Sequence, residues 1–249
     1  MIDVIIPCAD IDTPLLYKSV PMVRENVSDG VNNIYIVGTG MLLDISKDLD
    51  CKYVNELEFM GFSKHCINVS NKTRQGWVYQ QLIKLSSDKI SETDDFLICD
   101  ADHILLKPHR FIEGGKYNFH MEEEYHTPYF TTMERLLGND FTKTAEGSFI
   151  CDKMIFNKDI LNELKHDIEI HCGSNWINAI LNTYPRREFC GLSEFELYGT
   201  YILKKHPEKV NMMSSLRKLL FNEKLGYKTI QEIKEMFEDY DSVTEAKSS

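Results

Sequence analysis

The chain has 249 residues, with 28 Lys and Arg against 39 Asp and Glu, which gives a formal net charge of −11 at pH 7. Hydrophobic residues make up 43% and charged residues 27%, a composition that excludes disordered, collagen-like and disulfide-scaffold proteins. The acidic balance argues against a nucleic-acid partner, because a phosphate backbone requires clustered Lys and Arg.

The segment that begins at Met1 runs directly into an apolar strand pattern, without the basic stretch of a secretory signal. No run approaches the roughly 18 apolar residues that a membrane-spanning helix requires. The seven cysteines include no C-x-x-C pair, which disfavours zinc-ribbon and thioredoxin-like sites. These features predict a soluble, cytoplasmic protein that is not transmembrane and whose cysteines are reduced.

The first hundred residues alternate apolar strand patterns with helical spacing. The strands are expected at residues 4–6, 34–37, 52–54 and 96–99, and the helices at residues 15–27 and 74–85. This alternation is typical of an α/β fold with a mostly parallel sheet flanked by helices.

The second half of the chain is less regular. Strands are expected at residues 116–119 and 147–150, and helices at residues 158–164, 175–181 and 194–205. After Pro207 the sequence becomes rich in Lys and Glu, which favour helix. We therefore divide the chain into a catalytic domain, residues 1–207, and a helical C-terminal extension, residues 208–249.

Two aspartates, Asp100 and Asp102, flank one alanine where the strand at residues 96–99 ends. Ligands of open α/β sheets bind beyond the carboxyl ends of the strands. Carboxylates without a neighbouring Lys or Arg suit a hard cation, Mn²⁺ or Mg²⁺, and such a cation can bridge a substrate diphosphate. The alternative interpretation is that the pair only caps or turns the chain.

The D-x-D pair and the order of several segments around it give the chain a pattern that resembles the GT-A-fold glycosyltransferases. These enzymes use nucleotide sugars. The resemblance covers about residues 3–206 and is greatest to small bacterial and viral members. It rests on the strand opening at residues 4–7, the Gly-Trp, Gln-Gln and Lys-Leu pairs within residues 76–85, the D-x-D pair itself, and residues 193–198. It implies a GT-A, Rossmann-like fold with a mixed, mostly parallel sheet.

The resemblance also implies roles at the first strand and at the D-x-D pair. Asp102 would ligate the metal, and Asp100 would contact the ribose or a metal-bound water. The loop that begins at Pro7 would surround the nucleoside, with Asp10 as a partner of the base or ribose. The alternative for Asp10 is compensation of the dipole of the following helix.

The helix at residues 74–85 would complete the nucleotide-sugar site. Arg74 and Lys84 would neutralise charge on the diphosphate, and Gln80 or Gln81 would hydrogen-bond the sugar or ribose. The alternative is that these polar side chains only solvate the helix.

A late carboxylate would act as the base that deprotonates the acceptor. Ser193 and Glu196 form a capping-box pattern, which gives Glu196 a structural role and leaves Glu194 free to face a cleft. A helix N-terminus favours the ionised form that a general base requires. We therefore predict Glu194 as the base, with Asp152 in reserve; a solvent-facing Glu194 is the alternative.

A late histidine often supplies a third metal ligand in this fold, and His206 is the candidate here. A histidine at a helix C-terminus is also stabilised by the dipole alone. The Lys/Glu pattern of the extension would form a homodimer contact, or a peripheral contact with a membrane that carries a lipid-linked acceptor. A solvated helical face is the simpler interpretation.

These features together predict a metal-dependent, inverting glycosyltransferase. It would transfer a sugar from a nucleoside-diphosphate sugar, most simply a UDP-sugar, to a glycan or other hydroxyl acceptor. The alternatives are a retaining, glycogenin-like transferase, a D-x-D phosphohydrolase and a non-catalytic sugar-binding domain.

Overall fold

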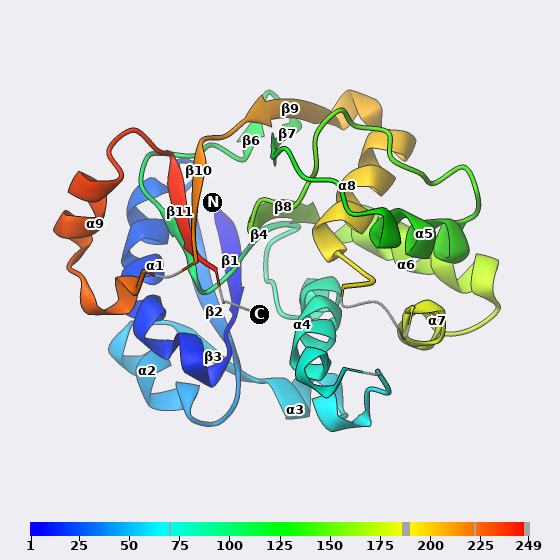
Figure 1. The fold of residues 1–249 in the computed structure, drawn as a ribbon, viewed down its shortest axis with the longest axis horizontal. Helices are drawn as coiled ribbons and strands as arrows, with labels where there is room; N and C mark the ends of the chain where they lie inside the picture. Colours follow the sequence, from blue (N-terminus) through cyan, green and yellow to red (C-terminus); the bar gives the residue numbers. More distant parts are fainter. Residues whose placement is uncertain (70, 186–189, 222, 247–249) are drawn as a thin grey trace.

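A five-stranded sheet lies at the centre of the part of the chain that the computed structural model describes, residues 1–69, 71–185, 190–221 and 223–246 (Figure 1). In spatial order its strands are β3 (Lys52–Asn55), β2 (Val31–Gly38), β1 (Ile2–Pro7), β4 (Asp95–Cys99) and β8 (Lys153–Asn157). The first four run parallel, and β8 pairs antiparallel with β4. The predicted α/β fold with a mostly parallel sheet is therefore confirmed.

The central strands are apolar because the sheet is covered on both faces. Every residue of β1 is buried, including the one acid within it, Asp3. The Asp3 carboxylate accepts hydrogen bonds from the starts of the two neighbouring strand segments, donated by Asn32, Asn33, Ser91, Glu92 and Thr93. Burial by itself would raise the pKa of Asp3, but these hydrogen bonds lower it below its ordinary value.

Helices cover the two faces of the sheet (Figure 1). On one face lie α1 (Thr13–Asn26) and α2 (Leu42–Asp48); on the other lie α4 (Gln75–Leu85), α6 (Lys158–Cys172) and α8 (Glu194–Lys205). The remaining helices of this body are α3 (Glu56–Met60), α5 (Thr127–Leu137) and α7 (Trp176–Thr183). Short 3₁₀ helices occur at Asp10–Asp12, Lys64–Cys66, Lys72–Arg74, Ser87–Lys89, Pro207–Lys209 and Leu225–Tyr227.

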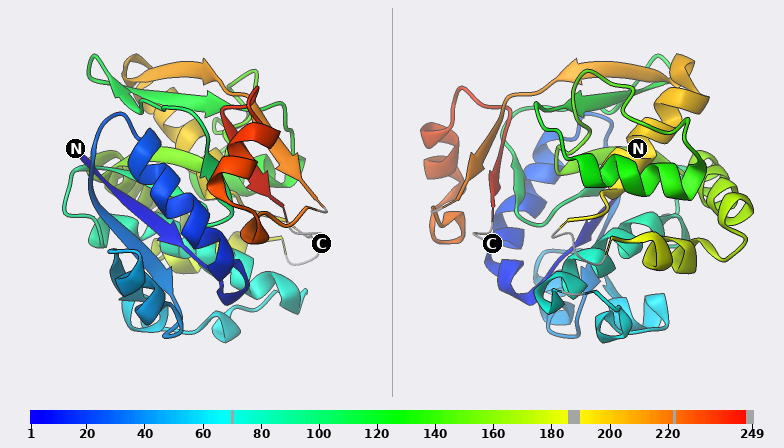
Figure 2. Two further views of the ribbon diagram at one scale, coloured as in Figure 1. Left: turned by 90° about the vertical axis from the view of Figure 1, so that its left-hand side faces the viewer. Right: turned by 45° about the vertical axis from the view of Figure 1, so that its right-hand side comes forward.

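Two smaller sheets join the C-terminal segment to the body. One consists of β10 (Arg217–Leu220), β11 (Ser242–Glu245) and β5 (His103–Leu105); the other consists of β6 (Ile112–Glu113), β7 (Lys116–Met121) and β9 (Val210–Ser214). Together with α9 (Ile230–Met236), the first of these sheets packs beside α1, as Figure 2 shows. Leu15, Met22, Ile104, Ile233 and Val243 belong to the second hydrophobic core that forms there.

The C-terminal segment differs from the helical extension expected from the sequence. It contains one α-helix, α9, and three strands within its described residues. Strand β9 pairs with β7, and β11 pairs with β5 directly after the D-x-D turn. Lys and Glu favour helix only weakly, and burial of Val210, Leu220 and Val243 through strand pairing outweighs that preference.

Two further differences lie between residues 122 and 157. Residues 147–150, expected to be a strand, make only a single bridge, between Ser148 and Glu122. Helix α5 and strand β8 were not expected, although β8 completes the central sheet. Among the described helices, none has both the length and the apolar character needed to cross a bilayer.

Candidate functional site

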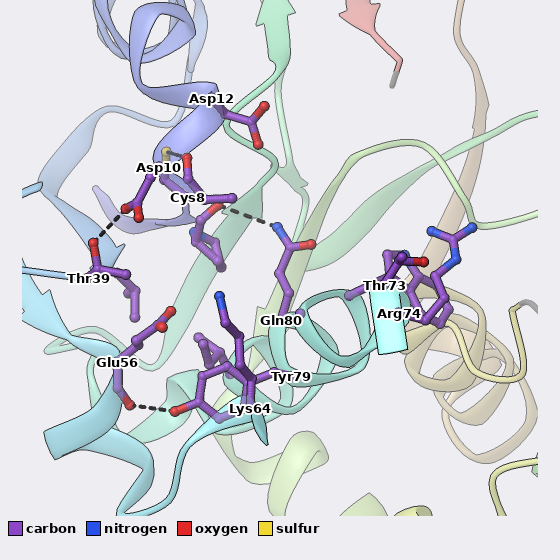
Figure 3. A pocket seen from close by; sticks show the side chains of 16 residues that line it. Cys8, Asp10, Asp12, Thr39, Glu56, Lys64, Thr73, Arg74, Tyr79 and Gln80 are labelled. Carbon is purple, nitrogen blue, oxygen red and sulfur yellow. Dashed lines mark hydrogen bonds between the residues drawn. The ribbon is translucent and has the colours of Figure 1, made fainter. Parts of the chain in front are cut away.

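A cavity of about 300 Å³ opens at the carboxyl end of the sheet, between the ends of β1 and β2 and the start of α4 (Figure 3). The loop after β1 and the segment between β3 and α4 supply most of its wall. Its polar lining includes Asp10, Asp12, Thr39, Glu56, Lys64, Thr73, Arg74 and Gln80. Parallel strands β1, β2 and β4 end at this edge, where ligands of open α/β sheets bind.

The β1 side of the cavity is held by two side-chain hydrogen bonds. Thr39 Oγ1 donates to Asp10 Oδ1 at 2.5 Å, and Gln80 Nε2 donates to the Pro7 carbonyl at 3.5 Å. These contacts fix the loop after β1 against β2 and α4. The loop therefore presents a defined polar wall to a bound molecule.

Lys64 points its ammonium group into the cavity from the opposite side, close to Glu56 (Figure 3). Burial raises the pKa of the Glu56 carboxyl, while the positive charge of Lys64 acts in the opposite direction and the charge of Asp10 adds to the increase. The cavity thus contains one lysine cation among carboxylates. Such a lysine can contact an anionic or carbonyl-bearing ligand.

The structure divides the residues expected to bind the nucleotide sugar into two groups. Pro7, Asp10 and Arg74 line the cavity. Gln81, Lys84 and Asp100 are not among its described lining residues; of the two glutamines expected to bind, Gln80 lines the cavity. Gln81 is buried instead, where its Oε1 accepts the backbone N–H of Glu194 at 3.0 Å.

Arg74 stands at the rim of the cavity, on the first turn before α4. Its guanidinium donates to Cys190 Sγ at 3.0 Å and lies over the ring of Trp77, 5.4 Å from the ring centroid. The side chain is half-buried, so it is accessible from the cavity while these contacts limit its motion.

The D-x-D pair follows β4 at the same edge of the sheet. The β1–β4 register, with Ile5 opposite Ile98, places Asp100 level with Pro7. Burial raises the pKa of Asp100 to about 6; the Lys84 ammonium opposes the increase, and the charges of Asp152 and Glu194 add to it. Asp102, two residues after Asp100, is half-exposed.

A buried ion pair beneath the D-x-D turn joins helices α4 and α8. The ammonium of Lys84 lies 2.5 Å from Asp100 Oδ1 and 2.5 Å from Glu194 Oε1. The side chains of Lys84 and Glu194 are each only 2% exposed, and that of Asp100 is 18% exposed. The burial of Lys84 between two carboxylates explains why it does not line the cavity.

The prediction that Glu194 is free to face a cleft is therefore wrong. Its carboxylate is buried against Lys84, which also lies 4.4 Å from the ring centroid of Phe195. The sequence pattern gave no sign of this partner, because Lys84 lies on a different helix. A role for Glu194 as base stays a prediction that its burial disfavours, since a base must reach the acceptor proton.

The expected capping box at the start of α8 forms only in part. Ser193 Oγ accepts the backbone N–H of Glu196 at 3.2 Å, as an N-cap does. The carboxylate of Glu196 does not complete the box: it accepts from Ser148 Oγ at 2.8 Å and from the Phe149 N–H at 3.0 Å. Burial raises the pKa of Glu196, and these two hydrogen bonds oppose the increase.

Asp152, the reserve candidate for the base, lies behind the D-x-D turn. Its carboxylate forms an ion pair with Arg217 and accepts from Thr244 Oγ1 at 2.7 Å. Both partners come from the C-terminal segment. Both carboxylates considered for the base, Glu194 and Asp152, are therefore engaged in ion pairs.

Among the described contacts, His206 makes none with Asp100 or Asp102. It ends α8, and its Nε2 lies 2.7 Å from Glu163 Oε2 of α6. Among the described residues, no three His, Cys, Asp or Glu side chains gather in a group that could hold a metal ion. The role of His206 as a metal ligand stays a prediction, and the contact that the structure shows for it is the one with Glu163.

Comparisons with known proteins identify the family and the fold of the chain. A sequence model of DUF6492, described as a family of unknown function, matches residues 41–239. The chain belongs to this family. No curated protein matches it significantly.

Solved structures show which fold this DUF6492 member shares. The apo form of mouse xyloside xylosyltransferase 1 aligns with a TM-score of 0.50 at 14% identity, over 98% of this chain and 97% of that one. The galactosyltransferase LgtC with donor and acceptor sugar analogs aligns at 0.50 and 11% identity, over 88% and 76% of the two chains. An active-site mutant of LgtC aligns at 0.53 and 12%, over 100% and 88%. The GT-A fold is therefore confirmed.

Several residues that shape the site in this DUF6492 member were not recognised in the sequence. Lys64 lines the cavity, and Arg217 and Thr244 bind Asp152. Lys64 gave no signal, because it lies in a segment without a regular pattern. Arg217 and Thr244 gave none, because they lie more than sixty residues after Asp152 in a segment expected to be helical.

Proposed function

We propose that this DUF6492 protein is a glycosyltransferase that uses a nucleoside-diphosphate sugar, most simply a UDP-sugar. The observation that carries the proposal is the D-x-D pair at the end of β4, level with a polar cavity at the carboxyl edge of a GT-A sheet. The structures that share this fold include a xylosyltransferase and a galactosyltransferase.

The cavity beside β1 would hold the nucleoside. Its volume of about 300 Å³ lies at the lower end of the range for small-molecule sites. Asp10 would accept a hydrogen bond from the base or ribose, and Lys64 would donate one to a carbonyl or anionic oxygen. Arg74, which also lines the cavity, would contact the diphosphate.

A divalent cation, Mn²⁺ or Mg²⁺, fits the donor set at the D-x-D turn. Asp100 and Asp102 offer hard carboxylate oxygens, and the half-exposed Asp102 would be the direct ligand. Mg²⁺ commonly takes one or two carboxylates and completes its shell with water and ligand phosphates. When bound, the cation would offset charge on the leaving diphosphate.

Lys84 and Glu194 would position Asp100 rather than contact the acceptor. The Lys84 ammonium holds the Asp100 carboxylate at 2.5 Å, and Glu194 holds the ammonium from its other side. The sequence-based preference for inversion rested on Glu194 as a base. Because Glu194 is buried, the retaining alternative has equal support, and the anomeric configuration of the product must decide between them.

Calorimetry of UDP binding tests the proposal at Asp102. We expect UDP to bind the wild type with an affinity that Mn²⁺ increases, and we expect Asp102→Asn to remove the Mn²⁺-dependent part with the fold intact. Asp44→Asn, an exposed aspartate on α2, is the matched control and should bind as the wild type does. Equal UDP and Mn²⁺ affinity in Asp102→Asn and wild type would overturn the assignment.

Release of free UDP from a panel of UDP-sugars tests the reaction itself. Slow donor hydrolysis that requires Mn²⁺ identifies a transferase even without its glycan or lipid-linked acceptor. UDP binding without release from any donor would indicate a non-catalytic sugar-binding domain. Hydrolysis of a generic phosphate ester, lost in Asp100→Asn, would indicate a phosphohydrolase instead.

A further inference from the structure

Asp152 adopts a backbone conformation that few side chains tolerate. Its φ of +59° lies in the left-handed region, where a non-glycine residue is disfavoured by roughly 1–2 kcal/mol. Aspartate is one of the residues that visits this region, and such a conformation persists where contacts with the surrounding structure hold it. The partners of Asp152 therefore determine whether the turn before β8 keeps its shape.

This turn supports the D-x-D pair directly. The backbone N–H of Asp100 donates to the carbonyl of Asp152 at 2.9 Å, where the end of β4 lies beside the start of β8. A change in the φ of Asp152 would reorient that carbonyl and release the Asp100 N–H. The position of the first aspartate thus depends on the conformation of Asp152.

Arg217 is the main partner of the Asp152 side chain. It lies on β10, is only 4% exposed, and pairs its guanidinium with Asp152 Oδ2 while its Nε lies 3.4 Å from Glu122 Oε1. A guanidinium can hold two carboxylates at fixed angles because its donors are planar and rigid. Arg217 therefore ties the Asp152 turn to the polar loop after β7.

Thr244 on β11 supplies the second contact. Its hydroxyl donates to Asp152 Oδ2 at 2.7 Å and lies 2.8 Å from His103 Nδ1. Because the Thr244 hydroxyl proton points to Asp152, His103 must donate its Nδ1–H to Thr244. The D-x-D turn, β5 and the C-terminal strands thus form one buried hydrogen-bond network.

We infer that Arg217 is a positioning residue, which acts through Asp152 to hold Asp100 in place, with Thr244 as its helper. The inference rests on the proposed function for its kinetic consequence, although the geometric part stands without it. It makes Arg217 and Thr244 part of the support of the site, rather than part of an appendage to a catalytic domain that ends at residue 207.

Hydrogen exchange at the Asp100 amide tests the geometric part. In Arg217→Met we expect this amide to exchange about tenfold faster than in wild type, because its acceptor is no longer fixed, while amides in α6 are unchanged. Thr244→Val should give a smaller change of the same sign. Lys218→Met, the next residue of β10, removes a charge over the ring of Tyr240 and should leave the Asp100 amide unchanged.

Kinetics of UDP release separate positioning from general loss of structure. We expect Arg217→Met to lower kcat by about tenfold or more, with the KM for the donor within about twofold of wild type, since Arg217 does not line the cavity. Arg217→Lys should recover part of kcat, because it keeps the charge but lacks the planar fork. Lys218→Met should match wild type.

Wild-type exchange at Asp100 in both Arg217→Met and Thr244→Val would overturn the inference, as would a rise in KM equal to the loss in kcat. If Arg217→Met does not fold, Arg217→Lys and Thr244→Val carry the same comparison. If the wild type releases UDP from no donor, the proposed function fails separately, and the exchange result alone decides the role of Arg217.

Discussion

The ammonium of Lys84 lies 2.5 Å from the carboxylate of Glu194, 110 residues away in sequence, and both side chains are excluded from water. The same ammonium contacts Asp100 at 2.5 Å. One buried cation therefore joins the helix before the D-x-D strand, the D-x-D turn and helix α8. Removal of that cation would leave two carboxylates buried without compensation.

We expect Lys84→Met to lower the free energy of unfolding by about 3–5 kcal/mol, the usual cost of removing one partner from a buried ion pair. Urea unfolding monitored by circular dichroism measures this. Lys47→Met is the control: its pair with Asp44 is 65% and 88% exposed, so its loss should cost less than about 1 kcal/mol. Equal losses in the two variants would contradict the structural role given to Lys84.

Gly199 on α8 is expected to resist substitution by alanine. A Cβ at this position would come within 2.4 Å of the ring of Phe149, which is fully buried. We therefore predict that Gly199→Ala lowers stability by about 1–3 kcal/mol, although alanine favours helix.

Gly76 on α4 provides the matched comparison, since a Cβ there would meet no atom within 4 Å. Gly76→Ala should raise stability by up to about 1 kcal/mol through helix propensity alone. Chemical unfolding of the two variants side by side measures both effects. A stabilised Gly199→Ala would show that α8 and Phe149 do not pack as described.

Stability should fall with decreasing pH because of His120. Burial, together with the positive charges of Lys153 and His109, lowers the pKa of His120 to about 3. Between pH 6.5 and about 3 the unfolded chain therefore binds a proton at this histidine that the folded chain excludes. This term reduces the free energy of unfolding by about 1.4 kcal/mol per pH unit below pH 6.5.

The His120→Phe variant isolates this term, because its ring fills the same space beside Phe111 without titrating. Unfolding free energies at several values between pH 4.5 and 7 should show a shallower pH dependence than in wild type. His65→Phe, an exposed position, should keep the wild-type slope. A wild-type slope in His120→Phe would mean that the histidine takes up a proton in the folded chain.

Lys64 is expected to contribute to ligand affinity. Because its ammonium points into the cavity, Lys64→Met should weaken UDP binding by about tenfold, or about 1.4 kcal/mol. Lys72→Met removes a nearby exposed lysine that does not line the cavity and should leave the affinity unchanged. Calorimetry on both variants measures the difference, and equal affinities would place the ligand outside this cavity.

The parts of the fold that the sequence predicted well are those with strong local patterns. The apolar runs of β1, β2 and β4 and the helical spacing of α4 and α8 each form from neighbouring residues. The Asp100–Asp102 pair was located for the same reason, since it directly follows one of these runs. Local pattern and tertiary structure agree in these segments.

The parts that were missed depend on contacts between distant residues. Nothing around Glu194 shows that Lys84 neutralises it, and nothing around Arg217 shows that Asp152 is its partner. The C-terminal strands were predicted as helix because β7 and β5, which they pair with, lie about ninety residues or more earlier in the chain. Such pairings are determined by the whole fold and have no local sequence signal.

The buried carboxylate of Asp3 has a consequence for the uniqueness of the fold. Strands β1, β2 and β4 are apolar on both faces, so shifted alignments of these strands would bury nearly the same hydrophobic area. Only the native alignment brings Asn32, Asn33 and the Ser91–Thr93 turn to Asp3 together. A misaligned sheet would bury the Asp3 carboxylate without these hydrogen bonds. A single acid thus selects one arrangement among several, and the alignment that it selects is the one that places Pro7 level with Asp100 at the other end of the strands.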